Sequence, residues 1–286
     1  MQKSGFALTV CALLASLAGP AGAAQPSSDE RFSRDHTLYG RGDWVGAPQA
    51  TSMKAGERLL VFQEGQAPAG ITVTRIGPTS RTAEAKYAWE LQGNTAPSYL
   101  ARLARPAVDD IPAAILAVRR LPASSSVMGG EPFALTATEL RVHVQKLPPK
   151  GRTGQPLIYG LRYGRNPGSR VVDLFVGYPT YAPKSKTDIK AIRFKRYSFA
   201  DGRLAGFDEF RRVSGLEERV DTPGPELTTR NWFDLGTKTV GFIRLKDSQT
   251  WYRLTIDEGF EGINYRAAAL GADEAPAYEG YHYTPH

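Results

Sequence analysis

Three carboxylates lie close together near the C-terminal end of the chain. Asp257 and Glu258 follow the alternating run Trp251 to Ile256, and Glu261 comes three residues later in a Gly-flanked turn. Two carboxyl groups about 5–10 Å apart can hydrolyse a glycosidic bond. Asp257, Glu258 and Glu261 are therefore the candidate catalytic residues. Because spacing along the chain does not fix that separation, the alternative is that they only solvate a turn.

Aromatic side chains accompany these carboxylates. Trp251 and Arg253 share one face of an extended strand, and Tyr281 and Tyr283 alternate in the same way near the end of the chain. Exposed rings beside polar groups are typical of a sugar-binding cleft, so these four are the candidate ligand-binding residues. Burial of Trp251 in the core is the competing interpretation.

The first 24 residues have the pattern of a secretory signal peptide. Lys3 gives a positive start, an apolar run follows from Ala7 to Gly19, and the small residues Ala21 to Ala24 suit a signal peptidase. The run is shorter than the ~20 residues that a membrane-spanning helix needs, and we expect no transmembrane segment. The sequence predicts an exported protein, periplasmic or extracellular.

Several other chemistries find little support in the residue types. The sole cysteine, Cys11, lies in the predicted signal, so the mature chain has no thiol nucleophile and no disulfide. The chain has no Gly-x-Ser-x-Gly motif. His282 and His286 are four residues apart, but Pro285 opposes the helix that would bring them together. We expect no metal and no cofactor, and leave open whether the chain is an enzyme.

Positive charge is concentrated in the middle of the chain. Residues 141–220 carry 17 Lys/Arg against 7 Asp/Glu, whereas residues 221–286 carry 6 against 10. This distribution favours an anionic partner: a glycan, a lipid headgroup or an acidic protein. Export makes nucleic acid an unexpected partner. Solvated strand faces are the alternative explanation of the charge.

Short alternating runs separated by turn residues predict a mainly β protein, built as an antiparallel sandwich or barrel-like sheets. The Asp201-Gly202 pair predicts a hairpin after Ile192 to Phe199. Leu140, Val142 and Val144 alternate with polar residues, which favours a further strand. The other predicted strands cover residues 58–62, 71–76, 86–92, 157–163, 171–178, 240–245 and 251–256.

One or two short helices are expected near residues 97–121. Asp109 or Asp110 can cap a helix, Pro112 suits its first turn, and Ile115 and Val118 follow at helical spacing. We divide the chain into a signal peptide (1–24), an N-terminal β-rich part (25–125) and a C-terminal antiparallel β domain (126–286).

The leading functional hypothesis is a non-catalytic periplasmic binding or interaction protein with a basic face on residues 141–220. A glycan-acting hydrolase that uses the paired carboxylates is the first alternative. An inhibitor of an envelope-targeted toxin is the second, because a disulfide-free β scaffold could serve that role.

Export gives the first testable prediction. Mass spectrometry of the mature protein should show an N-terminus at Ala24 or Gln25, because the small residues end there. A protein that keeps Met1 and stays in the cytoplasmic fraction would contradict the assignment.

Overall fold

The structure is a computed structural model of the chain. It describes residues 37–47, 53–78, 89–90, 99–105, 113–147, 156–164, 169–184, 189–214, 237–245, 248, 250–259, 262–270 and 278–283. The predicted signal peptide lies outside these residues. No helix within the described ranges is both long and apolar enough to cross a bilayer.

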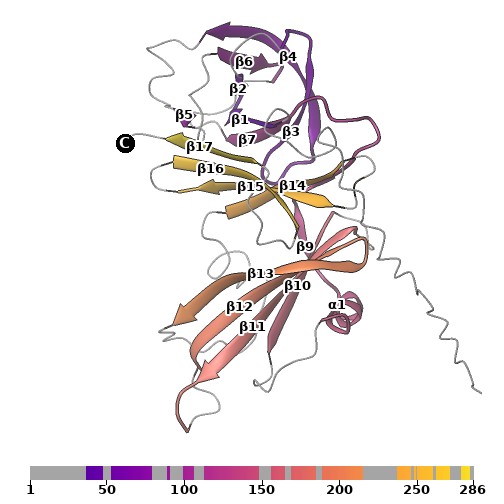
Figure 1. The fold of residues 1–286 in the computed structure, drawn as a ribbon, viewed down its shortest axis with the longest axis vertical. Helices are drawn as coiled ribbons and strands as arrows, with labels where there is room; N and C mark the ends of the chain where they lie inside the picture. Colours follow the sequence, from indigo (N-terminus) through magenta and orange to yellow (C-terminus); the bar gives the residue numbers. More distant parts are fainter. Residues whose placement is uncertain are drawn as a thin grey trace, which may run out of the picture.

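Six strands of the N-terminal part close into a barrel with the order β1-β2-β6-β4-β3-β7, seen at the top of Figure 1. Their bounds are β1 Thr37–Arg41, β2 Trp44–Ala47, β3 Arg58–Phe62, β4 Ala69–Pro78, β6 Tyr99–Leu103 and β7 Ala114–Val118. Buried apolar side chains such as Val45, Leu59 and Ile115 fill the interior. The strands expected at 58–62 and 71–76 are confirmed as β3 and part of β4.

The helices predicted near residues 97–121 are wrong. In the described part of that stretch the chain forms β6 and β7 instead. All five residues of β7 are buried, with Ile115 and Ala117 facing the barrel interior and Leu116 and Val118 facing the next layer. A strand covered on both faces is a continuous apolar run, and such a run can match helical spacing over a few residues.

The middle layer is a six-stranded sheet with the order β5-β17-β16-β15-β14-β8 (Figure 1). Its strands are β5 Trp89–Glu90, β8 Ser126–Gly129, β14 Thr237–Arg244, β15 Trp251–Glu258, β16 Gly262–Ala269 and β17 Tyr278–Tyr283. Its upper face packs on the barrel: Tyr39 stacks on Tyr265 with ring centroids 4.6 Å apart, and the Tyr265 hydroxyl donates to the carbonyl oxygen of Gly40. The strands expected at 240–245 and 251–256 are confirmed by β14 and β15, which pair antiparallel.

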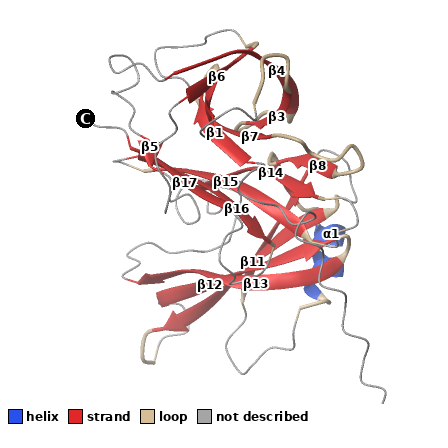
Figure 2. Cartoon of the chain, turned by 45° about the horizontal axis from the view of Figure 1, so that its top comes forward, coloured by secondary structure: helices blue, strands red, loops and turns tan. Residues whose placement is uncertain are grey.

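The third layer is a five-stranded antiparallel sheet with the order β13-β12-β11-β10-β9. Its strands are β9 Pro132–Ala134, β10 Leu157–Tyr163, β11 Val171–Tyr181, β12 Ile189–Ala200 and β13 Arg203–Ser214. The predicted hairpin joins β12 to β13, and its turn residues Asp201 and Gly202 have positive φ values of 47° and 77°, as a type I′ turn requires. Figure 2 shows this sheet meeting the six-stranded sheet at an angle.

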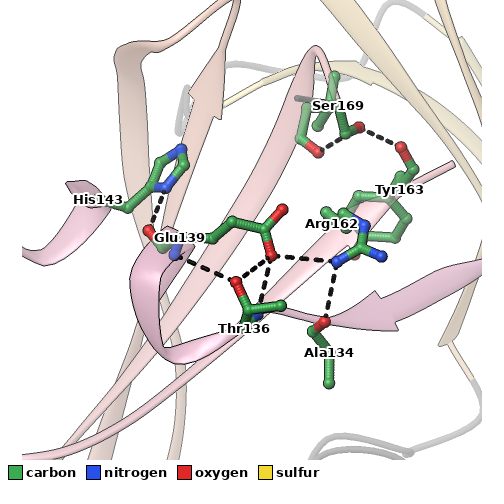
Figure 3. Close-up of polar contacts among 8 residues, drawn as sticks. Ala134, Thr136, Glu139, His143, Arg162, Tyr163 and Ser169 are labelled. Carbon is green, nitrogen blue, oxygen red and sulfur yellow. Dashed lines mark hydrogen bonds and ion pairs between the residues drawn. The ribbon is translucent and has the colours of Figure 1, made fainter. Parts of the chain in front are cut away.

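The strand expected around residues 140–145 is also wrong, because these residues belong to the helix α1 (Ala137–Val144). Thr136 and Glu139 form a capping box: the Thr136 hydroxyl accepts from the Glu139 amide, and the Glu139 carboxylate accepts from the Thr136 amide (Figure 3). Leu140, Val144 and Leu147 then cover the outer face of the five-stranded sheet. The local cap and this 3.6-residue spacing outweigh the apparent alternation.

The barrel and the six-stranded sheet approach each other closely at Gly241. A Cβ built on this glycine would lie 2.2 Å from the Phe62 ring, and Phe62 is fully buried. Gly241→Ala should therefore lower the free energy of unfolding by about 1–3 kcal/mol, measured by urea denaturation. Gly77→Ala in β4 is the control, because nothing lies within 4 Å of its added Cβ. Equal stability of the two variants would contradict the close approach.

Candidate functional site

A buried ion pair joins the two sheets. Arg253 of β15 and Asp173 of β11 are 6% and 0% exposed, and they come from strands 80 residues apart in the sequence. Charged groups are costly to bury unless they are paired and fully hydrogen-bonded. A buried ionic pair of this kind is a candidate functional centre.

The Asp173 carboxylate accepts four hydrogen bonds. The Arg253 guanidinium donates two, at 2.7 and 2.8 Å, while the Tyr163 hydroxyl and the Ser198 hydroxyl each donate one at 2.8 Å. Arg253 also donates to Ser198 at 3.1 Å and lies over the Phe242 ring, 5.3 Å from its centroid. Both carboxylate oxygens are thus fully engaged with protein groups.

The pKa of Asp173 reflects two opposing effects, burial on one side and the charges and hydrogen bonds around the carboxylate on the other. Burial alone would raise the pKa of Asp173, but the charge and hydrogen bonds of Arg253, together with the Arg196 charge, outweigh it and hold the pKa below its usual value. Burial, followed by the Asp173 charge, raises the pKa of the Tyr163 phenol. The contribution of the Asp173 carboxylate to stability is therefore present above its unfolded pKa and is lost as pH falls through the lower folded value.

A second ionic contact joins the same two layers at the β12–β13 turn. The Asp201 carboxylate accepts from the Trp251 indole at 2.9 Å and from the Arg244 guanidinium at 2.8 Å. Arg244 also lies over the Trp251 ring, 5.2 Å from its centroid. The turn that shapes the hairpin thus also fastens it to the six-stranded sheet.

These contacts place two of the sequence-predicted ligand-binding residues in the interior. Trp251 is 2% exposed and packs in the cluster between the sheets with Tyr163 and Phe242. Its neighbour on the same face, Arg253, is the partner of Asp173. Neither side chain lies at a surface that a sugar could stack on, and both serve the joint between the sheets.

The candidate carboxylates are not brought together as a pair where the structure describes them. Asp257 is half-buried and Glu258 is exposed at the end of β15, and consecutive strand positions point to opposite faces. Glu261 lies outside the described residues. Tyr281 and Tyr283 belong to β17, which pairs with β16. A catalytic role for these carboxylates, and a ligand-binding role for these tyrosines, remain predictions.

Sequence reasoning missed Asp173, Tyr163 and Ser198. One signal was available: Asp173 is the sole charge in the apolar run Val171 to Val176. A carboxylate inside a fully buried strand needs a cation from another element. Which cation it meets depends on how the sheets pack, and no local pattern specifies that.

Among the described side chains of the five-stranded sheet, two large apolar residues of β13 are exposed. Leu204 and Phe207 are 37% and 44% exposed. They stand opposite Phe199 and Tyr197 of β12, on the face that carries α1. The Lys195 ammonium lies 4.7 Å from the centroid of the Phe207 ring. We call Lys195, Leu204 and Phe207 the β13 patch.

Two basic side chains of β12 that the structure describes, Lys195 and Arg196, lie on opposite faces of the sheet. Lys195 lies on the α1 face with Phe207, whereas Arg196 influences the buried Asp173 on the opposite face. Of the basic residues of β12, Lys195 and Arg196 are the two whose side chains the structure describes, so whether this region forms one basic face stays a prediction. Lys195 lies on the outer side of the sheet, the side that carries α1, and Arg141 and Lys146 are exposed on the α1 segment.

Among the described residues no group of three or more His, Cys, Asp or Glu side chains could hold a metal ion.

Comparison with known proteins assigns no family to the chain. The chain matches no protein-family model, no curated protein and no solved structure.

The buried pair yields a prediction about stability. Arg253→Ala should cost about 3–5 kcal/mol of unfolding free energy, because it leaves a buried carboxylate without its cation. Adding Asp173→Asn to that variant should recover part of the loss, since the uncompensated charge is removed. Chemical denaturation at neutral pH measures both.

The matched control is Arg266→Ala on the adjacent strand β16. The Arg266–Glu279 pair is 3.6 Å apart, with both side chains over a third exposed, and exposed pairs are worth about 0–1 kcal/mol. A loss for Arg253→Ala no larger than the loss for Arg266→Ala would refute the stabilising role of the buried pair.

Proposed function

We propose that the chain is an exported interaction protein that binds an anionic partner through the β12–β13 hairpin and the α1 segment beside it. The observation that carries this proposal is the charge of the two strands, which hold seven Lys/Arg and two Asp/Glu. Such an excess raises the local concentration of anions and speeds their association.

The described polar groups favour a binder over an enzyme. The most strongly engaged carboxylate, Asp173, is fully buried and saturated with hydrogen bonds from four donor atoms. It offers no acid or base to a substrate. The candidate pair Asp257 and Glu258 points to opposite faces of one strand. The hydrolase hypothesis therefore gains nothing from the described geometry.

The hairpin is held rigidly enough to serve as a recognition element. Its turn is fastened by Asp201 to Arg244 and Trp251. The Lys146 ammonium donates to the Gly202 carbonyl oxygen at 2.7 Å, which ties the same turn to α1. A surface that is ordered before binding loses less conformational entropy when a partner arrives.

Binding to dextran sulfate tests the proposal. Affinity should fall steeply between about 50 mM and about 500 mM salt, because screened surface charges carry it. Lys195→Gln should weaken binding about fivefold, since it removes roughly 1 kcal/mol of charge interaction while keeping most of the side chain over Phe207. Titration followed by fluorescence anisotropy of labelled polymer gives both values.

Lys54→Gln is the control, because it removes the same charge from an exposed position in the barrel part. Equal effects of the two substitutions would mean that only net charge matters. Binding that does not change with salt, or no binding at all, would overturn the proposal.

A further inference from the structure

The β13 patch presents apolar surface and positive charge side by side. A soluble polyanion would contact the charge but gain nothing from the apolar surface. Leu204 and Phe207 expose large apolar surfaces, and Lys195 holds its charge directly above the Phe207 ring. Among the described residues only two other large apolar side chains are comparably exposed, Val127 and Val142. Val142 belongs to α1, on the same side of the sheet.

The position of the patch leaves it open at the edge of the sheet. β13 is at the edge of its sheet, and α1 covers the other strands through Leu140, Val144 and Leu147. The His143 ring packs edge-on against Phe199 at 5.0 Å, and Phe199 stands opposite Leu204. The helix therefore borders the patch without burying it.

Basic residues lie on the same helix and strands as these apolar groups. Arg141 and Lys146 are exposed on the α1 segment, and the β12–β13 strands carry a clear excess of Lys/Arg. The acidic positions Asp208 and Glu209 stand opposite Arg196 and Lys195, which offsets part of this charge. The remaining charge is positive, so the complementary surface is negative.

We infer that the β13 patch docks on an anionic lipid surface. Phosphate-bearing headgroups attract Lys and Arg near the membrane by about 1 kcal/mol each, while Phe and Leu gain by entering the boundary between headgroups and acyl chains. One surface therefore satisfies both halves of the patch. This inference rests on the proposed function and names the partner class within it.

Vesicle sedimentation of the purified protein tests the inference. Phosphatidylglycerol vesicles should bind it, whereas phosphatidylcholine vesicles should not. The double variant Leu204→Ser/Phe207→Ser should bind phosphatidylglycerol vesicles about tenfold more weakly, because it removes two partly inserted apolar side chains. Its affinity for dextran sulfate should stay that of the unmodified protein, since no charge is changed.

Val127→Ser is the matched control: Val127 has the same 37% exposure as Leu204 but lies on β8 of the other sheet. It should leave vesicle binding unchanged, and circular dichroism should show that all variants remain folded.

The two proposals fail in different ways. Dextran sulfate binding without vesicle binding, or a double variant that binds vesicles normally, overturns the lipid inference and leaves a soluble acidic partner for the hairpin. Binding to neither probe overturns the proposed function itself.

Discussion

The pairing of Arg253 with Asp173 is the interaction on which the two-sheet half of the molecule depends. A carboxylate with no exposure is tolerated only because one guanidinium and two hydroxyls donate to it. These donors come from both sheets, so the network exists only when β10, β11, β12 and β15 are in register. Because removing one partner leaves the other charge unpaired in a low dielectric, the network penalises every other arrangement of the sheets.

The six-stranded sheet is the central layer because both of its faces are covered. Along β15, Leu254 and Ile256 pack toward the barrel, whereas Trp251 and Arg253 pack toward the five-stranded sheet. Gly241 permits the close approach of Phe62, and the Tyr265 hydroxyl reaches the barrel backbone. The barrel and the five-stranded sheet are thus connected through this layer, without any disulfide.

The outer surface of the five-stranded sheet has a different character. On its inner side, Asp173 and Asp201 are paired with Arg253 and Arg244 of the six-stranded sheet. On its outer side, α1 packs on the apolar face. Among the described residues, the large apolar side chains that stay exposed on this side are Val142 and those of the β13 patch, where Lys195 lies over the Phe207 ring. The hairpin that presents it is anchored at its turn by Asp201. The same structure therefore provides a rigid interior and an exposed amphipathic surface.

Local patterns in the sequence determined the β class, most strands of the two sheets and the Asp201-Gly202 turn, because strand alternation and positive φ angles are short-range properties. They also place Trp251 and Arg253 correctly on one face of β15. Only the tertiary structure decided that this face is buried, since burial depends on which layer lies against it. For the same reason β7 resembled a helix and α1 resembled a strand: a few residues fit both periods, and packing on both faces or capping by Thr136 selects between them. The partner of Asp173 was equally beyond local reasoning, because it lies 80 residues away in the sequence.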